Sequence, residues 1–155
     1  IRLSLVGSEM CIRDRCYNIH MNKQQLIETL SNNRRALGFD AERYNMHMPI
    51  GPYTLSVSVG DGMYSMPRQG GLEPEDYRKV EAAIIDSDGE LMSVKQIHNK
   101  FGLYCAQQCE SYGLGDDDSD SWEDMCTVMP YVSWDVVVHV ANAIELHSPS
   151  AKDLI

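Results

Sequence analysis

Four side chains in the second half of the chain have the chemistry of zinc ligands: His98, Cys105, Cys109 and Cys126. The first three are separated by seven and four residues, which places them on one face if that segment is helical. Zinc-binding cysteines usually include a Cys-x2-Cys pair, and the sequence contains none. Because unpaired thiols behave as small hydrophobic side chains, we expect core packing here. A small zinc-binding protein or enzyme is the alternative.

An acidic loop late in the chain is a second candidate cation site. Asp116, Asp118 and Asp120 stand at the first, third and fifth positions of an EF-hand loop. Such a loop requires a glycine at its sixth position and a glutamate at its twelfth, where the chain has Ser121 and Thr127. We therefore expect a solvated loop and no bound calcium.

The residue types of nucleophilic catalysis are present but follow no known pattern. The sequence has no Gly-x-Ser-x-Gly elbow, no His-Glu-x-x-His pair and no glycine-rich phosphate loop. His47, His139 and His147 belong to no motif. We expect a protein that is not an enzyme and that uses no cofactor.

Three side chains suit recognition instead of catalysis. Tyr64, Arg68 and Tyr77 could project around a common loop next to a hairpin. Tyrosine and arginine dominate the energetic centres of protein interfaces, so these residues are candidate binding contacts. The alternative is that Tyr64 packs into the core while Arg68 pairs with an acidic side chain.

The charge balance restricts the class of partner. The 155 residues include 13 Lys and Arg against 23 Asp and Glu, for a formal net charge of -10. An acidic chain is repelled by nucleic-acid phosphates and by anionic membranes, so we expect neither as a partner. No apolar run approaches the ~18 residues of a membrane-spanning helix. We expect a cytoplasmic protein with reduced thiols and a protein partner.

The first 15 residues resemble a translated sequencing adapter. Codons of a transposon end used in library preparation spell the stretch 9–14, and a primer tail accounts for residues 5–8. We therefore expect residues 1–20 to be a leader foreign to the fold. The expected organisation is a single domain over 21–150 followed by a tail over 151–155.

Local patterns predict helices and strands in alternation. The clearest strand is 53–59, where Tyr53, Leu55, Val57 and Val59 alternate with small polar residues. We expect the apolar face of this strand to be buried and its polar face to be wet. We expect a helix that Ser133 caps and that carries one apolar face to Leu146. The other predicted elements are a helix over 22–37 capped by Asn22, an irregular stretch over 39–52, a return strand over 63–66, a helical turn over 74–77, a strand over 79–86, a hairpin turn at 88–89, a helix over 95–112, a polar loop over 113–124 and an edge strand over 126–132.

These elements predict an α+β fold. We expect a small, mostly antiparallel sheet with an N-terminal and a C-terminal helix packed on it.

Three short segments carry a resemblance to small uncharacterised proteins encoded by bacteriophages. They are 63–69, 80–84 and 130–136, and the resemblance spans roughly 53–147. It implies a phage accessory protein and transfers no catalytic residue. We therefore expect a non-enzymatic protein-interaction module that acts in the host cytoplasm. A virion or structural component that self-associates is the remaining alternative.

Overall fold

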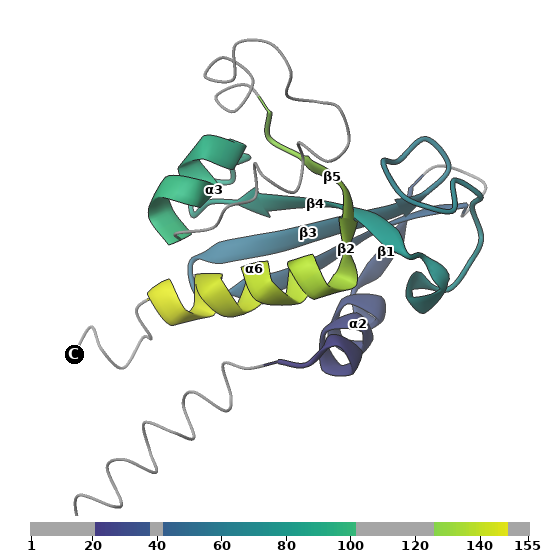
Figure 1. The fold of residues 1–155 in the computed structure, drawn as a ribbon, viewed down its shortest axis with the longest axis horizontal. Coiled ribbons are helices and arrows are strands. Elements are labelled where there is room, and N and C mark those ends of the chain that lie inside the picture. The colour runs from purple at the N-terminus through teal and green to yellow at the C-terminus, as the bar shows by residue number, and fades with distance from the viewer. Residues whose placement is uncertain (1–20, 38–41, 102–125, 149–155) are drawn as a thin grey trace, which may run out of the picture.

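The computed structural model describes residues 21–37, 42–101 and 126–148. These form a five-stranded antiparallel sheet in the order β1-β2-β3-β4-β5, with three helices and one 3-10 turn (Figure 1). This confirms the α+β prediction. The elements are α2 (Lys23–Asn32), β1 (Arg34–Ala36), β2 (Arg43–Ile50), β3 (Tyr53–Gly60), η1 (Pro74–Asp76), β4 (Lys79–Ile85), α3 (Val94–Phe101), β5 (Met129–Ser133) and α6 (Trp134–His147).

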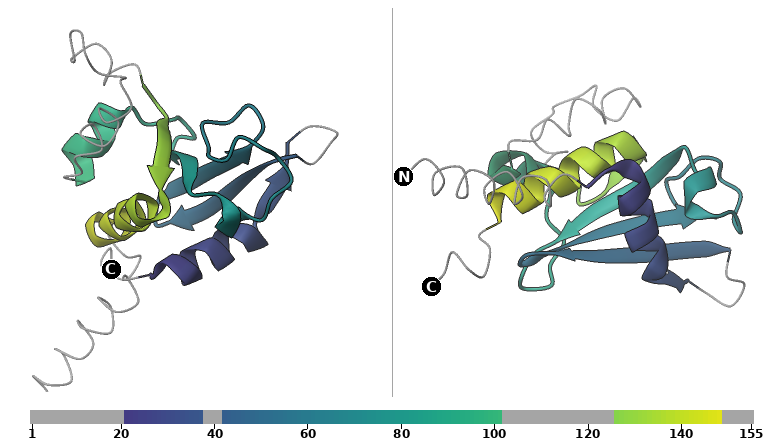
Figure 2. Two further views of the ribbon diagram at one scale, coloured as in Figure 1. Left: turned by 45° about the vertical axis from the view of Figure 1, so that its right-hand side comes forward. Right: turned by 90° about the horizontal axis from the view of Figure 1, so that it is seen from below.

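The molecule has two layers. Helices α2 and α6 both contact β2, α6 also contacts β4, and α3 packs against α6. All three helices lie on one side of the sheet, as the two views of Figure 2 show. Within the described residues no helix covers the other side, which we call the uncovered face. In the same residues no helix is long and apolar enough to cross a membrane.

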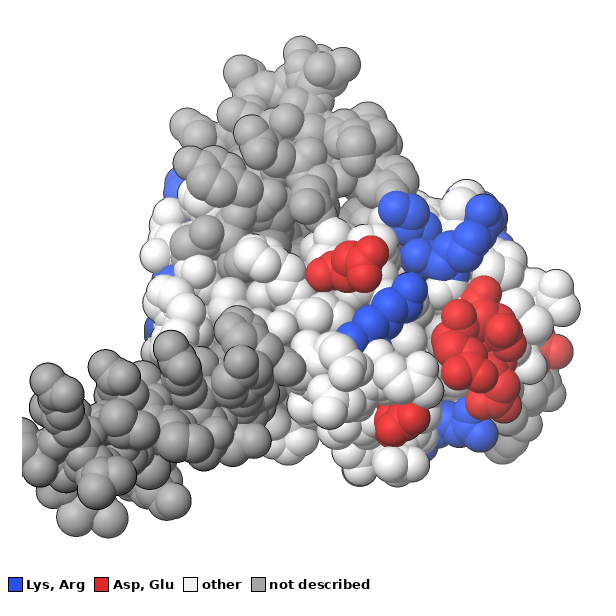
Figure 3. Space-filling model, turned by 60° about the horizontal axis from the view of Figure 1, so that its bottom comes forward, with Lys and Arg blue, Asp and Glu red and all other residues white. Residues whose placement is uncertain are grey.

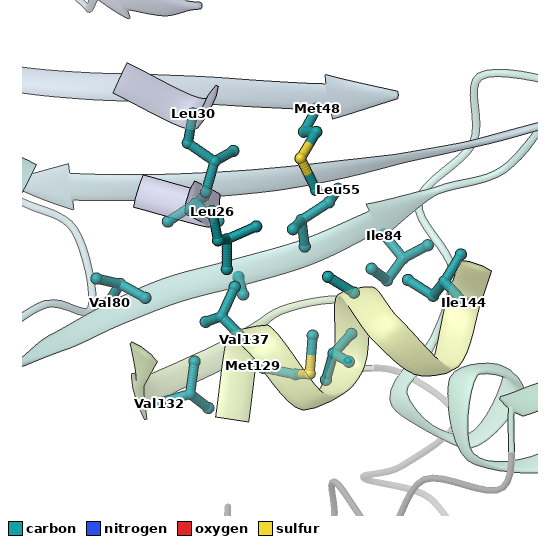
Figure 4. Close-up of a cluster of buried hydrophobic side chains, with 14 of the residues drawn as sticks. Leu26, Leu30, Met48, Leu55, Val80, Ile84, Met129, Val132, Val137 and Ile144 are labelled. Carbon is teal, nitrogen blue, oxygen red and sulfur yellow. The ribbon is translucent and has the colours of Figure 1, made fainter. Parts of the chain in front are cut away.

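The core lies between the helices and the sheet (Figure 4). The buried face predicted for β3 is confirmed, because Leu55, Val57 and Val59 are fully buried. Leu26 of α2 and Ile144 of α6 close over this face of the sheet and are also fully buried. Burying one such side chain contributes about 1.5–3 kcal/mol, so this apolar layer is the main source of stability.

The prediction of an irregular stretch over 39–52 is wrong, because β2 pairs with β3 along its whole length. Pro49 argued against a strand, since proline has no N–H to donate. In the structure it stands opposite Thr54, next to the pair that closes a two-residue turn at Gly51 and Pro52. Antiparallel pairs alternate in their hydrogen bonding, so the nitrogen of Pro49 points away from β3. On the side of β2 that faces β1, the pairing already ends at Met46. The missing N–H of Pro49 therefore costs the sheet no hydrogen bond.

The first helix is shorter than predicted. Asn22 caps it as expected: its side chain accepts from the Gln25 N–H, and the Gln25 side chain accepts from the Asn22 N–H. The helix ends at Asn32, and the stretch predicted to continue it is the edge strand β1. The helical spacing of these residues is only a weak local preference, and their pairing with β2 outweighs it.

The segment 63–66 does not pair with β3, and that prediction is also wrong. Both edges of β3 are occupied, by β2 and by β4. Met66 instead bridges to Lys79 at the start of β4. The predicted turn over 74–77 and strand over 79–86 are confirmed as η1 and β4. The hairpin turn at 88–89 also forms, with the Asp86 carboxylate accepting from the N–H groups of Asp88 and Glu90.

The C-terminal elements match their prediction. The edge strand is β5, and Ser133 caps α6 by accepting from the Val136 N–H at 3.3 Å. Leu146 is the exception, since it is 63% exposed and does not belong to the buried face. Helix α3 supplies the first part of the helix predicted over 95–112. The remainder of that helix and the acidic loop over 113–124 lie outside the described residues.

Candidate functional site

The proposed zinc ligands fall partly outside the described residues. Cys105 and Cys109 lie there, as do the aspartates of the candidate calcium loop. His98 is half-buried on α3, and the thiol of Cys126 donates to the carbonyl of Val128 at 2.9 Å. Within the described ranges no group of three His, Cys, Asp or Glu side chains is placed to hold a metal ion.

The three candidate recognition residues separate into two groups. Tyr77 is fully buried, and its hydroxyl donates to the backbone carbonyl of Gln69 at 2.8 Å. Its own carbonyl accepts from the indole N–H of Trp134 at 2.9 Å. Burial raises the pKa of the Tyr77 phenol above its ordinary value. Tyr77 therefore anchors the loop after β3 to α6 and does not project with the other two.

Tyr64 and Arg68 do meet, around a residue that the sequence did not single out. The rings of Tyr64 and Tyr131 pack edge to face, with 5.7 Å between their centroids. The guanidinium of Arg68 donates to the hydroxyl of Tyr131 at 3.1 Å. We call Tyr64, Arg68 and Tyr131 the aromatic cluster. Tyr64 is 54% exposed, so the expected alternative, in which it packs into the core, is wrong.

A β-bulge positions Tyr131 in this cluster. Val80 pairs with Val132 and Ala82 pairs with Met129, so two residues of β5 stand opposite one residue of β4. Tyr131 has a φ of 52°, a left-handed conformation that costs a non-glycine residue about 1–2 kcal/mol. The register of the sheet therefore decides where this ring points, and nothing in the local sequence around it indicates that register.

Backbone hydrogen bonds hold the two tyrosines together. The N–H of Tyr131 donates to the carbonyl of Tyr64 at 3.0 Å. The N–H of Tyr64 donates to the carboxylate of Glu81 at 3.1 Å. Glu81 lies on β4, directly across from Ser58 of β3. The aromatic cluster is thus attached to the border of the uncovered face.

A polar row crosses that face. Arg35, Asn45, Ser58 and Glu81 are successive partners across β1, β2, β3 and β4. The side-chain amide of Asn45 donates to the hydroxyls of Ser58 at 2.8 Å and Ser56 at 3.0 Å. The strand prediction expected the serines of β3 to be wet, yet both are nearly buried. The row is therefore an ordered set of polar groups.

Charges of both signs share the surface seen in Figure 3. Acidic atoms form one continuous patch at the end of the molecule where η1 lies, with basic atoms on either side. η1 carries Glu75 and Asp76, and Glu73 precedes it. Glu73 is bonded to Arg34 at 3.0 Å. The net negative charge of the chain is thus not spread evenly over this side.

Comparison with known proteins adds no assignment to this site. No protein family, no curated protein and no solved structure matches the chain.

Proposed function

We propose that this chain is a non-enzymatic protein-interaction module that binds its partner through the aromatic cluster. The observation that carries the proposal is a tyrosine pair, with Tyr64 exposed and Tyr131 half-buried, and an arginine fixed beside it. Tyrosine and arginine are enriched among the residues that dominate binding energy at protein interfaces. Met66, 43% exposed, lies two residues from Tyr64 and adds apolar surface.

The order of the cluster favours binding. Immobilising a flexible side chain at an interface costs about 0.5–1.5 kcal/mol. Here the Tyr131 hydroxyl already restrains Arg68. The backbone of Tyr64 is fixed by two hydrogen bonds, one from its N–H and one to its carbonyl. Part of the entropic cost of ordering these side chains is therefore incurred when the chain folds and not when it binds.

The sheet edges point to recognition through side chains and not through strand addition. The edge strand β1 has three residues, two of which are Arg34 and Arg35. The other edge strand, β5, contains Pro130 and the bulge at Tyr131. Short, charged, bulged and proline-containing edges resist the addition of another strand. A partner is therefore expected to contact the cluster itself.

The proposed setting is the cytoplasm of a phage-infected cell, with the chain as a phage accessory protein. Two of the segments that carry the phage resemblance, 63–69 and 130–136, contain Tyr64, Arg68 and Tyr131. The same short segments thus account for both the resemblance and the proposed contact.

Photo-crosslinking tests the proposal. Benzoylphenylalanine is placed at Tyr64 in the full chain and, as a control of similar exposure, at Leu91 (54% and 48%). We expect a discrete adduct with a bacterial protein from position 64 alone. An excess of unlabelled wild-type chain should prevent formation of the adduct. The Arg68→Gln chain should prevent it poorly, whereas the Arg78→Gln chain should prevent it as well as the wild type does.

Two results would contradict the proposal. Equal adducts from both positions would mean that the cluster is ordinary surface. An adduct only with a second copy of the chain would favour the structural component in its place.

A further inference from the structure

A hollow of about 550 Å³ opens on the uncovered face beside the two strands nearest the sheet edge. It is open to solvent and lies away from the aromatic cluster, which sits at the opposite edge, beside β5. Its lining consists of Asn33, Arg34, Arg35, Asn45, His47 and Pro49. The volume is within the ~300–1,000 Å³ typical of small-molecule sites.

Of the two arginines that line this hollow, only Arg34 has a carboxylate partner among the described residues. Arg34 is already neutralised, because its guanidinium is bonded to Glu73 at 3.0 Å and lies over the ring of Tyr44, 5.1 Å from its centroid. Arg35 is exposed, and within the described part of the chain no carboxylate pairs with it. An unpaired guanidinium presents several N–H donors in a geometry that suits phosphate oxygens.

Two hydroxyls of β3 hold the side chain of Asn45, which lines the hollow between Arg35 and His47. The Asn45 amide uses its two N–H bonds on Ser56 and Ser58, so each hydroxyl oxygen is already an acceptor. Ser56 and Ser58 themselves are nearly buried and do not line the hollow. The N–H donors that the lining offers an anion include the Arg35 guanidinium and the His47 imidazole.

Strand register places these donors within reach of one anion. Arg35 is the direct partner of Asn45, and His47 is the direct partner of Ser56. Direct partners in an antiparallel pair are about 5 Å apart, and alternate residues along one strand are about 7 Å apart. Arg35 lies one strand from Asn45, and His47 lies two residues further along that strand, so a guanidinium and an imidazole flank one small area. A carboxylate ligand has two oxygens to offer them, whereas a phosphate group has more.

We infer that the Arg35–Asn45–His47 hollow is a binding site for the phosphate group of a small ligand. Arg35 and His47 hold the phosphate oxygens, and the rest of the hollow accommodates the remainder of a phosphate ester. This site is independent of the proposed protein contact.

Titration of the full chain followed by amide NMR shifts tests the inference. The probes are inorganic phosphate, glycerol phosphate and acetate at constant ionic strength. We expect saturable shifts centred on Arg35, Asn45 and His47 with both phosphates and much weaker shifts with acetate. Tighter binding of glycerol phosphate would identify a phosphorylated small molecule as the ligand, and equal binding would identify the phosphate ion.

Charge-matched variants separate the site from general attraction. Arg35→Gln should weaken phosphate binding about tenfold or more, because it removes a charge-assisted bond. Arg78→Gln, an exposed change of equal charge, should have no effect. Asn45→Asp should abolish binding by placing a negative charge in the hollow, whereas Asn99→Asp on α3 should not.

The inference is overturned by shifts that do not saturate, by acetate binding as tightly as phosphate, or by equal losses from Arg35→Gln and Arg78→Gln. Each variant's thermal unfolding is measured alongside, so that a loss of fold is recognised. If Arg35→Gln unfolds, Asn45→Asp and its control decide the matter.

Discussion

Replacing Tyr77 by phenylalanine removes a single oxygen from the core. The phenol ring is fully buried and keeps its packing, so no cavity is created. What is lost is the hydrogen bond to the Gln69 carbonyl, 2.8 Å long. Such a bond contributes about 1 kcal/mol net, because the freed carbonyl of an exposed loop residue can bond to water. For a chain of this length the melting temperature should fall by about 3 °C.

The effect should depend on pH in a defined direction. Burial raises the pKa of Tyr77, so the folded chain keeps this proton where the unfolded chain, with its pKa near 10.0, releases it. The resulting stabilisation is complete below about pH 10 and is lost as the pH rises toward the folded pKa. Tyr77→Phe has no proton to lose at this position. The difference in unfolding free energy between the two proteins should therefore shrink above about pH 10.

Urea unfolding of both proteins at neutral and alkaline pH is the assay. Tyr64→Phe is the matched control, since its hydroxyl is exposed and makes no hydrogen bond within the described residues. We expect this control to change stability by less than about 0.5 kcal/mol. The reasoning is refuted if Tyr77→Phe is as stable as the wild type, or if their difference is the same at every pH.

Two further predictions concern the helix ends. Asn22→Ala removes the side-chain oxygen that accepts from the Gln25 N–H in the capping box and should cost about 1 kcal/mol in urea unfolding, whereas Asn32→Ala should cost less. Burial raises the pKa of Glu145, so the protonated form stabilises the fold below about pH 4.5 and this stabilisation is lost as the pH rises. Glu145→Gln should therefore raise the melting temperature at pH 7 but not at pH 3. The control Glu90→Gln should leave the melting temperature unchanged at both pH values. An equal effect of Glu145→Gln at pH 7 and pH 3 would contradict this prediction.

The elements that were predicted correctly are those whose pattern is complete within a few residues. In β3 every second side chain is apolar, and an apolar face turned to the core follows directly from a period of two. Helix α6 begins at its capping residue, Ser133. These features depend on neighbours along the chain, so they are visible without the tertiary structure.

The elements that were missed depend on partners far away in the sequence. Pro49 led to the prediction of an irregular stretch, because proline cannot donate a backbone hydrogen bond. The register with β3 shows that its nitrogen faces no partner. The helix predicted to reach residue 37 is cut short because β1 finds hydrogen-bonding partners in β2. In both cases a tertiary hydrogen-bond ladder outweighs a local preference of a fraction of a kcal/mol per residue.

The candidate sites divide in the same way. Residue types and spacing were enough to select Tyr64 and Arg68, because exposed tyrosine and arginine on a turn are typical of recognition surfaces. Only the bulge between β4 and β5 brought Tyr131 to them, and only the register of β1 and β2 placed Arg35 beside Asn45. Side-chain direction in a sheet reverses with a shift of one residue, so a convergence of side chains across strands is decided by tertiary pairing alone.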